Sequence, residues 1–77
     1  MNTPIDPARV AQLLNLSPAE SRVVALLADG FSVREIAEII ERQPGTVYWH
    51  LKRIYKRLGL YRQVDLVLLV LTRLNRG

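Results

Sequence analysis

Residues 32–52, SVREIAEIIERQPGTVYWHLK, contain the signals for two helices joined by a turn. Ser32 and Glu35 form a capping box, in which a hydroxyl and a carboxylate bind the free N–H groups at a helix start. Apolar residues then recur at helical spacing until Ile40. Pro44 suits the first turn of a second helix, because the N–H group that proline lacks would have no partner there. The stretch therefore predicts a short helix, a turn of about four residues and a longer helix.

The longer helix, about 44–58, divides into two faces when its residues are placed on a helical wheel. An apolar stripe consists of Val47, Leu51, Ile54 and Leu58, and the opposite stripe consists of Trp49, Lys52, Arg53 and Lys56. Tyr48 and Tyr55 share a flank, where we expect them at the border of the core. The outward stripe thus places one tryptophan among three cations, and Gly59 is available to end the helix.

Helix signals also occupy the rest of the chain. Asp6 is placed to cap a first helix that continues to Asn15. Ser17 opens a second capping box before a helix over about 18–29, and residues 62–75 have the pattern of a last helix. No alternating apolar pattern between turn residues indicates a strand. We therefore expect an all-α domain of four core helices with a short N-terminal helical arm.

The composition limits the class of protein. Seventy-seven residues form one small domain, and the absence of cysteine excludes a disulfide framework and a thiolate metal site. The sequence has no apolar run long enough to span a bilayer and no secretory signal, so we expect a soluble, cytoplasmic protein. Its net charge of +4 and its isoelectric point near 10.1 favour an acidic partner.

The positive charge is concentrated in one segment. Between Arg42 and Val64 there is no acidic residue, and all seven acidic residues lie outside this segment. Its six basic residues are Arg42, Lys52, Arg53, Lys56, Arg57 and Arg62. Such a block is often only a solvated face, but a basic stripe along one helix is also typical of nucleic-acid binding.

Several short motifs follow one another in the order found in one known domain. They are Leu16-Ser17-Pro18-x-Glu20, Leu27-x-x-Gly30-x-Ser32-x-x-Glu35-Ile36-Ala37, Gly45-Thr46-Val47-x-x-His50-Leu51, Ile54-Tyr55 and Leu58-Gly59. With these motifs, residues 16–70 resemble the LuxR/GerE-type DNA-binding domain. The promoter-reading region 4 of sigma factors shares the first capping box, the Glu35-Ile36-Ala37 helix and the Gly45-Thr46-Val47 start. However, His50 and the Leu58-Gly59 ending, followed by a further helix, favour the LuxR type.

The resemblance implies a fold, a function and a location. Residues 1–15 would form the N-terminal arm and residues 16–75 the DNA-binding domain, with the helix-turn-helix at about 33–52 and the recognition helix at about 44–58. The implied function is sequence-specific binding of double-stranded DNA by a bacterial transcriptional regulator, whose recognition helix enters the major groove. Such a regulator acts in the cytoplasm, at the nucleoid, and needs no cofactor or metal.

The resemblance also assigns candidate contacts to individual residues. Positions expected to reach base edges are Tyr48, Trp49 and Lys52. Positions expected beside phosphates are Arg34, Thr46, Arg53 and Lys56. Tyrosine at 48 replaces a residue that is usually basic in the family, and tryptophan at 49 replaces a smaller or aliphatic one. These rings can contact a thymine methyl group but cannot form the pair of hydrogen bonds that arginine makes with guanine.

The turn also differs from the family pattern. Where the family tends to have Leu-Gly-Ile-Ser, this chain has Ile40-Glu41-Arg42-Gln43. Without the glycine, we expect a non-glycine residue at positive φ, at a cost of about 1 kcal/mol. Gln43 is a weaker N-cap than serine, and Arg42 replaces an apolar contact with a cation.

The last helix has more apolar residues than one buried face requires. We expect its bundle-covering stripe to be Val64, Val67, Leu68, Leu71 and Leu74. The dimerisation candidates on its remaining surface are Leu66, Leu69, Val70 and Arg73. The resemblance likewise implies a homodimer through residues 62–75. In the alternative, the N-terminal arm covers this surface through Val10, Leu13 and Leu14. Too few cations flank the helix for a role at a membrane surface.

Two other classes of function compete with DNA binding. Trp49 beside cations also resembles a protein-interaction hot spot. The alternative is therefore a regulator that binds protein and not DNA, through this helix or the apolar C-terminal helix. RNA polymerase or another regulator is a further candidate partner of the domain, beside DNA. Catalysis is not expected, because no second histidine, cysteine or carboxylate lies at catalytic or metal-ligand spacing from His50. We expect His50 to be structural.

Overall fold

Five helices make up most of residues 3–76, the part of the chain that the computed structural model describes. They are α1 (Pro7–Leu14), α2 (Pro18–Ala28), α3 (Val33–Ile40), α4 (Pro44–Leu58) and α5 (Gln63–Arg76). Each begins and ends within about one residue of the range predicted from the start and stop signals. No strand occurs among the described residues. The all-α prediction is confirmed.

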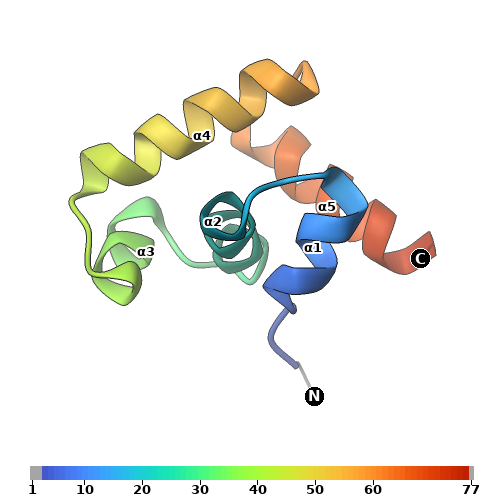
Figure 1. Cartoon of the computed structure of the whole chain (residues 1–77), viewed down its shortest axis with the longest axis horizontal. Coiled ribbons are helices and arrows are strands. Elements are labelled where there is room, and N and C mark those ends of the chain that lie inside the picture. Colours follow the sequence, from blue (N-terminus) through green and yellow to red (C-terminus); the bar gives the residue numbers. More distant parts are fainter. Residues whose placement is uncertain (1–2, 77) are drawn as a thin grey trace.

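Helix α2 is the centre of the bundle and contacts every other helix. In Figure 1 it is seen end-on, with α3 and the first turns of α4 on one side and α1 and α5 on the other. Because it is surrounded, α2 is apolar on more than one face, and Val23, Val24 and Ala25 are almost completely buried. The outer helices each bury one apolar stripe and leave the rest of their surface to water.

The first three helices begin at the caps that the sequence predicts. Asp6 accepts a hydrogen bond of 3.0 Å from a backbone N–H in the first turn of α1. Ser17 and Ser32 form complete capping boxes with Glu20 and Glu35, respectively. Each cap stabilises its helix by about 1 kcal/mol. These bonds join residues that are close in the sequence, so they define the helix starts independently of tertiary packing.

The α3–α4 turn has the strained backbone expected from its lack of glycine. Glu41 has φ 58° and ψ 47°, which is the left-handed region. This conformation lets the Arg42 N–H donate to the Ala37 carbonyl at 2.9 Å and so closes the end of α3. Gln43 makes no side-chain hydrogen bond to the start of α4. The turn therefore joins α3 to α4 at a cost of about 1 kcal/mol in backbone energy.

The buried face of α5 is not the one predicted. Leu66 and Val70 are buried, at 0% and 1% exposure, whereas Leu68 is 57% exposed. Leu71 is also exposed, and Leu69 is only partly buried. Val64 is likewise 50% exposed. The prediction that Val64, Leu68 and Leu71 cover the bundle was therefore wrong. The placement of Leu66 and Val70 on a free surface was wrong as well.

Helix α1 accounts for this difference, since it packs against both α2 and α5. Val10 and Leu14 belong to the same core cluster as Leu66. The Arg73 guanidinium donates a hydrogen bond to the Leu13 carbonyl at 3.4 Å. The alternative in which the N-terminal helix folds over α5 is therefore the one observed. Burial of α5 between α1 and α2 decides which of its apolar residues face inward.

Substitution of two leucines in α5 tests this assignment. We expect Leu66→Ala to lower the free energy of unfolding by about 2–5 kcal/mol, because it leaves a cavity in the core. Leu68→Ala removes the same atoms from an exposed position and should cost less than about 1 kcal/mol. Urea denaturation followed by circular dichroism measures both changes. Equal losses for the two variants would contradict the assigned faces.

Candidate nucleic-acid interface

The outward face of α4 carries the groups predicted to meet nucleic acid. Trp49, at 55% exposure, lies at the surface with the side chains of Lys52, Arg53 and Lys56. Within residues 3–76, none of these three cations forms an ion pair. Val47, on the opposite face of the helix, is completely buried. The helical phase predicted from the sequence is confirmed, and the cations on this face are free to attract an anionic partner.

Neighbours on the same helix restrain the Trp49 ring. The guanidinium carbon of Arg53 lies 4.8 Å from the centre of the ring, a cation–π contact. The His50 ring meets Trp49 edge to face, with ring centres 5.1 Å apart and an angle of 67° between the planes. This stacking was not predicted, although the i, i+4 spacing of Trp49 and Arg53 was a signal for it. The indole is thus ordered while it remains exposed.

Tyr48 lies farther from the core than predicted. Its side chain is 61% exposed, whereas Tyr55 on the same flank is partly buried against the core, which raises the pKa of the Tyr55 hydroxyl. Both line an open, mainly apolar hollow of about 300 Å³, which Val33 and Gln63 also line. The starts of α3 and α5 contribute one lining residue each, and the Tyr48 ring is left largely exposed. It is available to a partner beside Lys52.

The remaining predicted phosphate contacts come from two helices. Thr46 is partly buried in the first turn of α4, and Arg34 is exposed in the first turn of α3. No ion pair links Arg34 to α4 in the described part of the chain. Gln43 makes no side-chain hydrogen bond to the first turn of α4, where Pro44 has no N–H and the Thr46 N–H donates to the Gln43 carbonyl at 3.0 Å. The candidate contacts therefore lie along α4 and at the start of α3.

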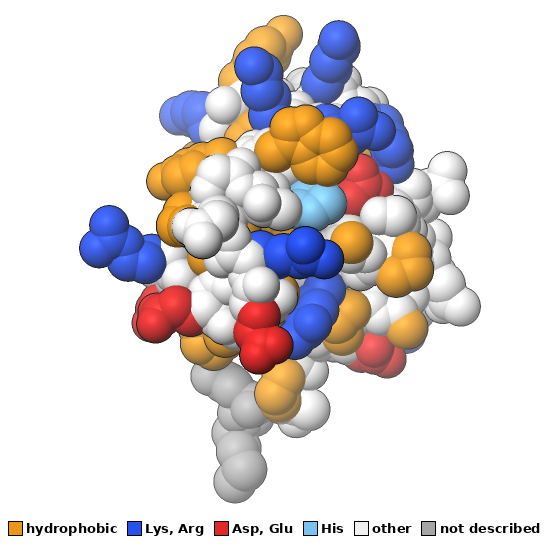
Figure 2. Space-filling view, turned by 60° about the vertical axis from the view of Figure 1, so that its left-hand side comes forward, with side chains coloured by type: hydrophobic (Ala, Val, Ile, Leu, Met, Phe, Trp, Pro, Cys, Tyr) orange, Lys and Arg blue, Asp and Glu red, His pale blue; other side chains and the backbone are white. Residues whose placement is uncertain are grey.

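Figure 2 shows the face of the molecule that contains the single histidine, in pale blue. Lys and Arg side chains gather along the top of this face, and others lie directly below the histidine. Acidic side chains lie mostly lower on this face, but one lies directly beside the histidine and another lies against the basic side chains below it. Basic side chains therefore predominate at the top of this face, which makes that part of the surface attractive to polyanions.

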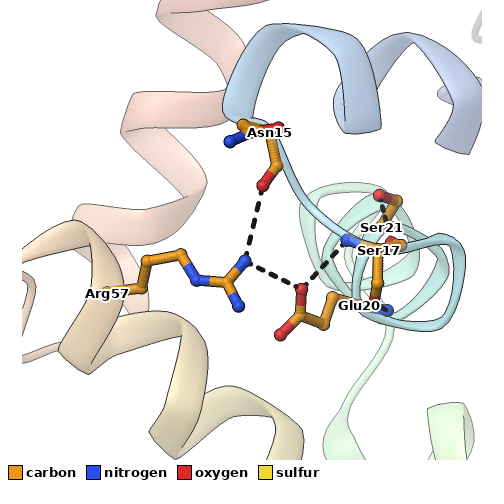
Figure 3. A network of polar contacts seen from close by, with 5 residues as sticks. All are labelled: Asn15, Ser17, Glu20, Ser21 and Arg57. Atoms are coloured by element: carbon orange, nitrogen blue, oxygen red, sulfur yellow. Dashed lines mark hydrogen bonds and ion pairs between the residues drawn. The ribbon is translucent and has the colours of Figure 1, made fainter.

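Arg57, near the end of α4, has a structural role. Its Nη1 lies 3.2 Å from Glu20 Oε1 and donates to the Asn15 carbonyl at 3.4 Å (Figure 3). The same Glu20 oxygen accepts the Ser17 N–H at 3.0 Å. The sequence predicts a cap for Glu20 and a place in the basic segment for Arg57, and it does not predict the ion pair between them. These hydrogen bonds connect the last turns of α4 to the start of α2 and so help to orient the outward face of α4.

This network also lowers the pKa of the Glu20 carboxyl group. The hydrogen bond from the Ser17 N–H is the largest cause, and the charge of Arg57 acts in the same direction, whereas burial opposes both. In the other capping box, hydrogen bonds from Ser32 lower the pKa of Glu35. Both carboxyl groups are therefore ionised at neutral pH and act as acceptors for helix N–H groups.

Neither a metal-ion cluster nor a membrane-spanning helix is found among the described residues. Between residues 3 and 76, no group of three or more His, Cys, Asp or Glu side chains is arranged to hold a metal ion. The helices of the same region are too short or too polar to cross a bilayer. The site is built from aromatic rings, cations and a hydroxyl, a set suited to binding.

The sequence is similar to bacterial regulators. The sequence profile of the family described as "Bacterial regulatory proteins, luxR family" matches residues 14–70. A protein of Mycobacterium bovis and one of Mycobacterium tuberculosis, both named "Putative HTH-type transcriptional regulator", are 42% identical to the chain over 53 residues. The match covers 69% of this chain but only 6% of the length of each relative. No solved structure matches the chain significantly.

Glu20→Gln tests the contribution of the Glu20 charge to stability. The pKa of Glu20 in the folded state lies below its ordinary value of 4.5. Its charge therefore stabilises the fold above about pH 4.5, and this contribution is lost as the pH falls through the folded-state pKa. We expect Glu20→Gln to lower the free energy of unfolding by about 1 kcal/mol at neutral pH. In acid, the difference from wild type should disappear.

Urea denaturation at a series of pH values measures this difference. Glu38→Gln removes the same charge from an exposed side chain of α3 and serves as the control. The role given to the network is contradicted if the two variants differ from wild type by the same amount at every pH.

Proposed function

We propose that this chain binds double-stranded DNA by inserting α4 into the major groove. The chain belongs to the luxR family of bacterial regulatory proteins. The observation that carries the proposal is the outward face of α4, where Trp49 lies exposed among three cations. No acidic residue occurs in this helix to repel phosphates. The proposed activity is control of transcription at the nucleoid, in the bacterial cytoplasm, and it requires no catalytic group.

Base recognition is assigned to the middle of this face. The Trp49 indole has one N–H donor and an apolar ring that packs against a thymine methyl group, and Tyr48 adds a hydroxyl. Lys52, one turn further along, donates to the acceptors of guanine. Because Arg53 already holds the indole by stacking, the ring loses less conformational freedom on binding than a mobile side chain would. This favours Trp49 as a residue that contacts bases and contributes to sequence specificity.

The flanking residues are assigned to the DNA backbone. Lys56, Thr46 and Arg34 are placed to contact phosphates, and the Arg53 guanidinium combines its stacking role with a positive charge. Each such contact adds affinity without sequence preference and makes binding more dependent on salt. Arg57 is omitted from this set, because its guanidinium is held by Glu20.

A homodimer is proposed through the exposed apolar row of α5. Val64, Leu68 and Leu71 lie at spacing i, i+4 and i+7 on one side of this helix and are 50%, 57% and 44% exposed. A two-fold interface along this row buries them and presents two α4 helices to two half-sites. This row replaces the residues first considered, because Leu66 and Val70 are in the core and Arg73 bonds to α1.

Selection of bound sequences from random duplex DNA, at a low and a high salt concentration, tests DNA binding. Wild type should enrich a defined sequence. Trp49→Ala should lose about tenfold in discrimination at one base pair, while its low-salt binding persists, because the cations are unchanged. Lys52→Glu with Lys56→Glu should abolish binding.

Arg9→Glu with Arg76→Glu makes the same change of charge at exposed positions of α1 and α5 and serves as the control. If wild type enriches no duplex, and wild type and Trp49→Ala bind equally weakly at low salt, DNA recognition by this domain is wrong. The protein-binding alternative then gains support.

Substitution of Leu68 tests the dimer. We expect wild type to sediment as a dimer and Leu68→Glu as a monomer, because a buried carboxylate in the interface has no partner. Tyr61→Glu places the same charge at a position that is 91% exposed outside α5, and should leave the dimer intact. Sedimentation velocity at several protein concentrations provides the measurement. A wild-type monomer at every concentration would rule out this interface.

A further inference from the structure

We propose that a cationic hollow beside the recognition helix binds one further phosphodiester group of the DNA backbone. The hollow has a volume of about 440 Å³, and its lining residues are Ala19, Arg22, Ile40, Arg42, Thr46 and His50. The inference rests on the proposed DNA-binding function. It extends the contact surface from α4 to α2 and to the α3–α4 turn, and it gives Arg22, Arg42 and His50 a common ligand.

Three separate parts of the fold supply the polar groups of this hollow. Arg22 comes from α2, Arg42 comes from the α3–α4 turn, and Thr46 and His50 come from successive turns of α4. Thr46 and His50 are four residues apart and therefore project from the same side of the helix. In Figure 2 the histidine has Lys and Arg side chains directly below it, on the side away from the cations at the top of the face.

The two arginines of the hollow have no carboxylate partner. Arg22 and Arg42 are exposed, and neither forms an ion pair in the described residues. By contrast, Arg57 pairs with a carboxylate at 3.2 Å and Arg62 with another at 3.3 Å. Two guanidinium groups that share one hollow repel each other, and an anion between them removes that repulsion. The planar donor fork of arginine matches the oxygen atoms of phosphate, which identifies the class of ligand.

The position of the hollow favours a phosphate of DNA over a free anion. On the helical wheel, Thr46 and His50 lie on one flank of Trp49, and Tyr48 and Lys52 lie on the other. His50 also contacts the Trp49 ring directly, so the hollow adjoins the face assigned to base recognition. A helix in the major groove has a DNA strand on each flank. The hollow lies where one of these strands passes.

The salt dependence of DNA binding tests this inference. Binding of a fluorescein-labelled duplex, taken from the selection described above, is followed by fluorescence anisotropy between about 50 and 200 mM salt. Arg22→Gln with Arg42→Gln should reduce the slope of log K against log salt by about 0.9, the value for one phosphate contact. Affinity at the lower salt concentration should fall about tenfold.

The matched control is Arg9→Gln with Arg76→Gln, which removes two charges from exposed positions of α1 and α5. We expect it to keep the wild-type slope. Circular dichroism checks that each variant is folded, and the single variant Arg42→Gln repeats the test with one change in an exposed turn. An unchanged slope in the Arg22/Arg42 variant, or an equal decrease in the control, overturns the inference and leaves DNA binding by α4 intact.

Two further outcomes would show that DNA binding itself, or the assignment of the hollow to the DNA backbone, is wrong. If wild type binds no duplex at any salt concentration, the proposed function itself fails, and the inference fails with it. Inorganic phosphate, titrated into the protein without DNA and followed by chemical shifts, is the probe for a small ligand. Phosphate could bind saturably to wild type and not to the Arg22/Arg42 variant, while the salt dependence of DNA binding is the same for both proteins. That result assigns the hollow to a free anion and overturns its assignment to the DNA backbone.

Discussion

The burial of α2 among the other four helices is the constraint on which the rest of the structure depends. The helices have 8 to 15 residues each, and helices of this length are marginal when isolated in water. Their stability comes from the apolar stripes that they bury against α2 and against one another. Because α4 and α5 both rest on α2, the direction of the proposed recognition helix and the surface of the last helix are set by one shared core.

The packing of α4 on α2 also explains why two arginines of α4 have different roles. Arg57 faces the start of α2, where the partly enclosed Glu20 carboxylate and the Asn15 carbonyl accept its N–H groups. Arg53 is one turn earlier, and its guanidinium carbon lies 4.8 Å from the centre of the Trp49 ring, although its charge also helps to lower the pKa of Glu20. One cation therefore stabilises the position of the helix, and the other orders the surface that we assign to DNA. Position relative to the core, and not residue type, separates these roles.

Two locally unfavourable features of the backbone lie next to the proposed site. Glu41 adopts a left-handed backbone conformation without being glycine, and α4 begins without a side-chain cap. Structures often tolerate such local costs at functional sites, where the surrounding packing compensates for them. Here the uncapped helix start and the exposed Arg42 lie beside Thr46, at the edge of the cationic hollow. The turn therefore lowers the stability of the adjoining helix ends, and it exposes groups that can bind an anion.

The sequence by itself determined the helix boundaries and the outward face of α4. The capping boxes, prolines and glycines act between residues within one turn of each other, and α4 has only one apolar stripe to bury. Only the tertiary structure decided which face of α5 is buried, because α5 has apolar residues on several sides and α1 selects among them. The pairing of Arg57 with Glu20, 37 residues apart, and the hollow that brings Arg22 to His50 depend equally on packing. Partners that are distant in the sequence meet only when the helices share a core, and no local pattern specifies that meeting.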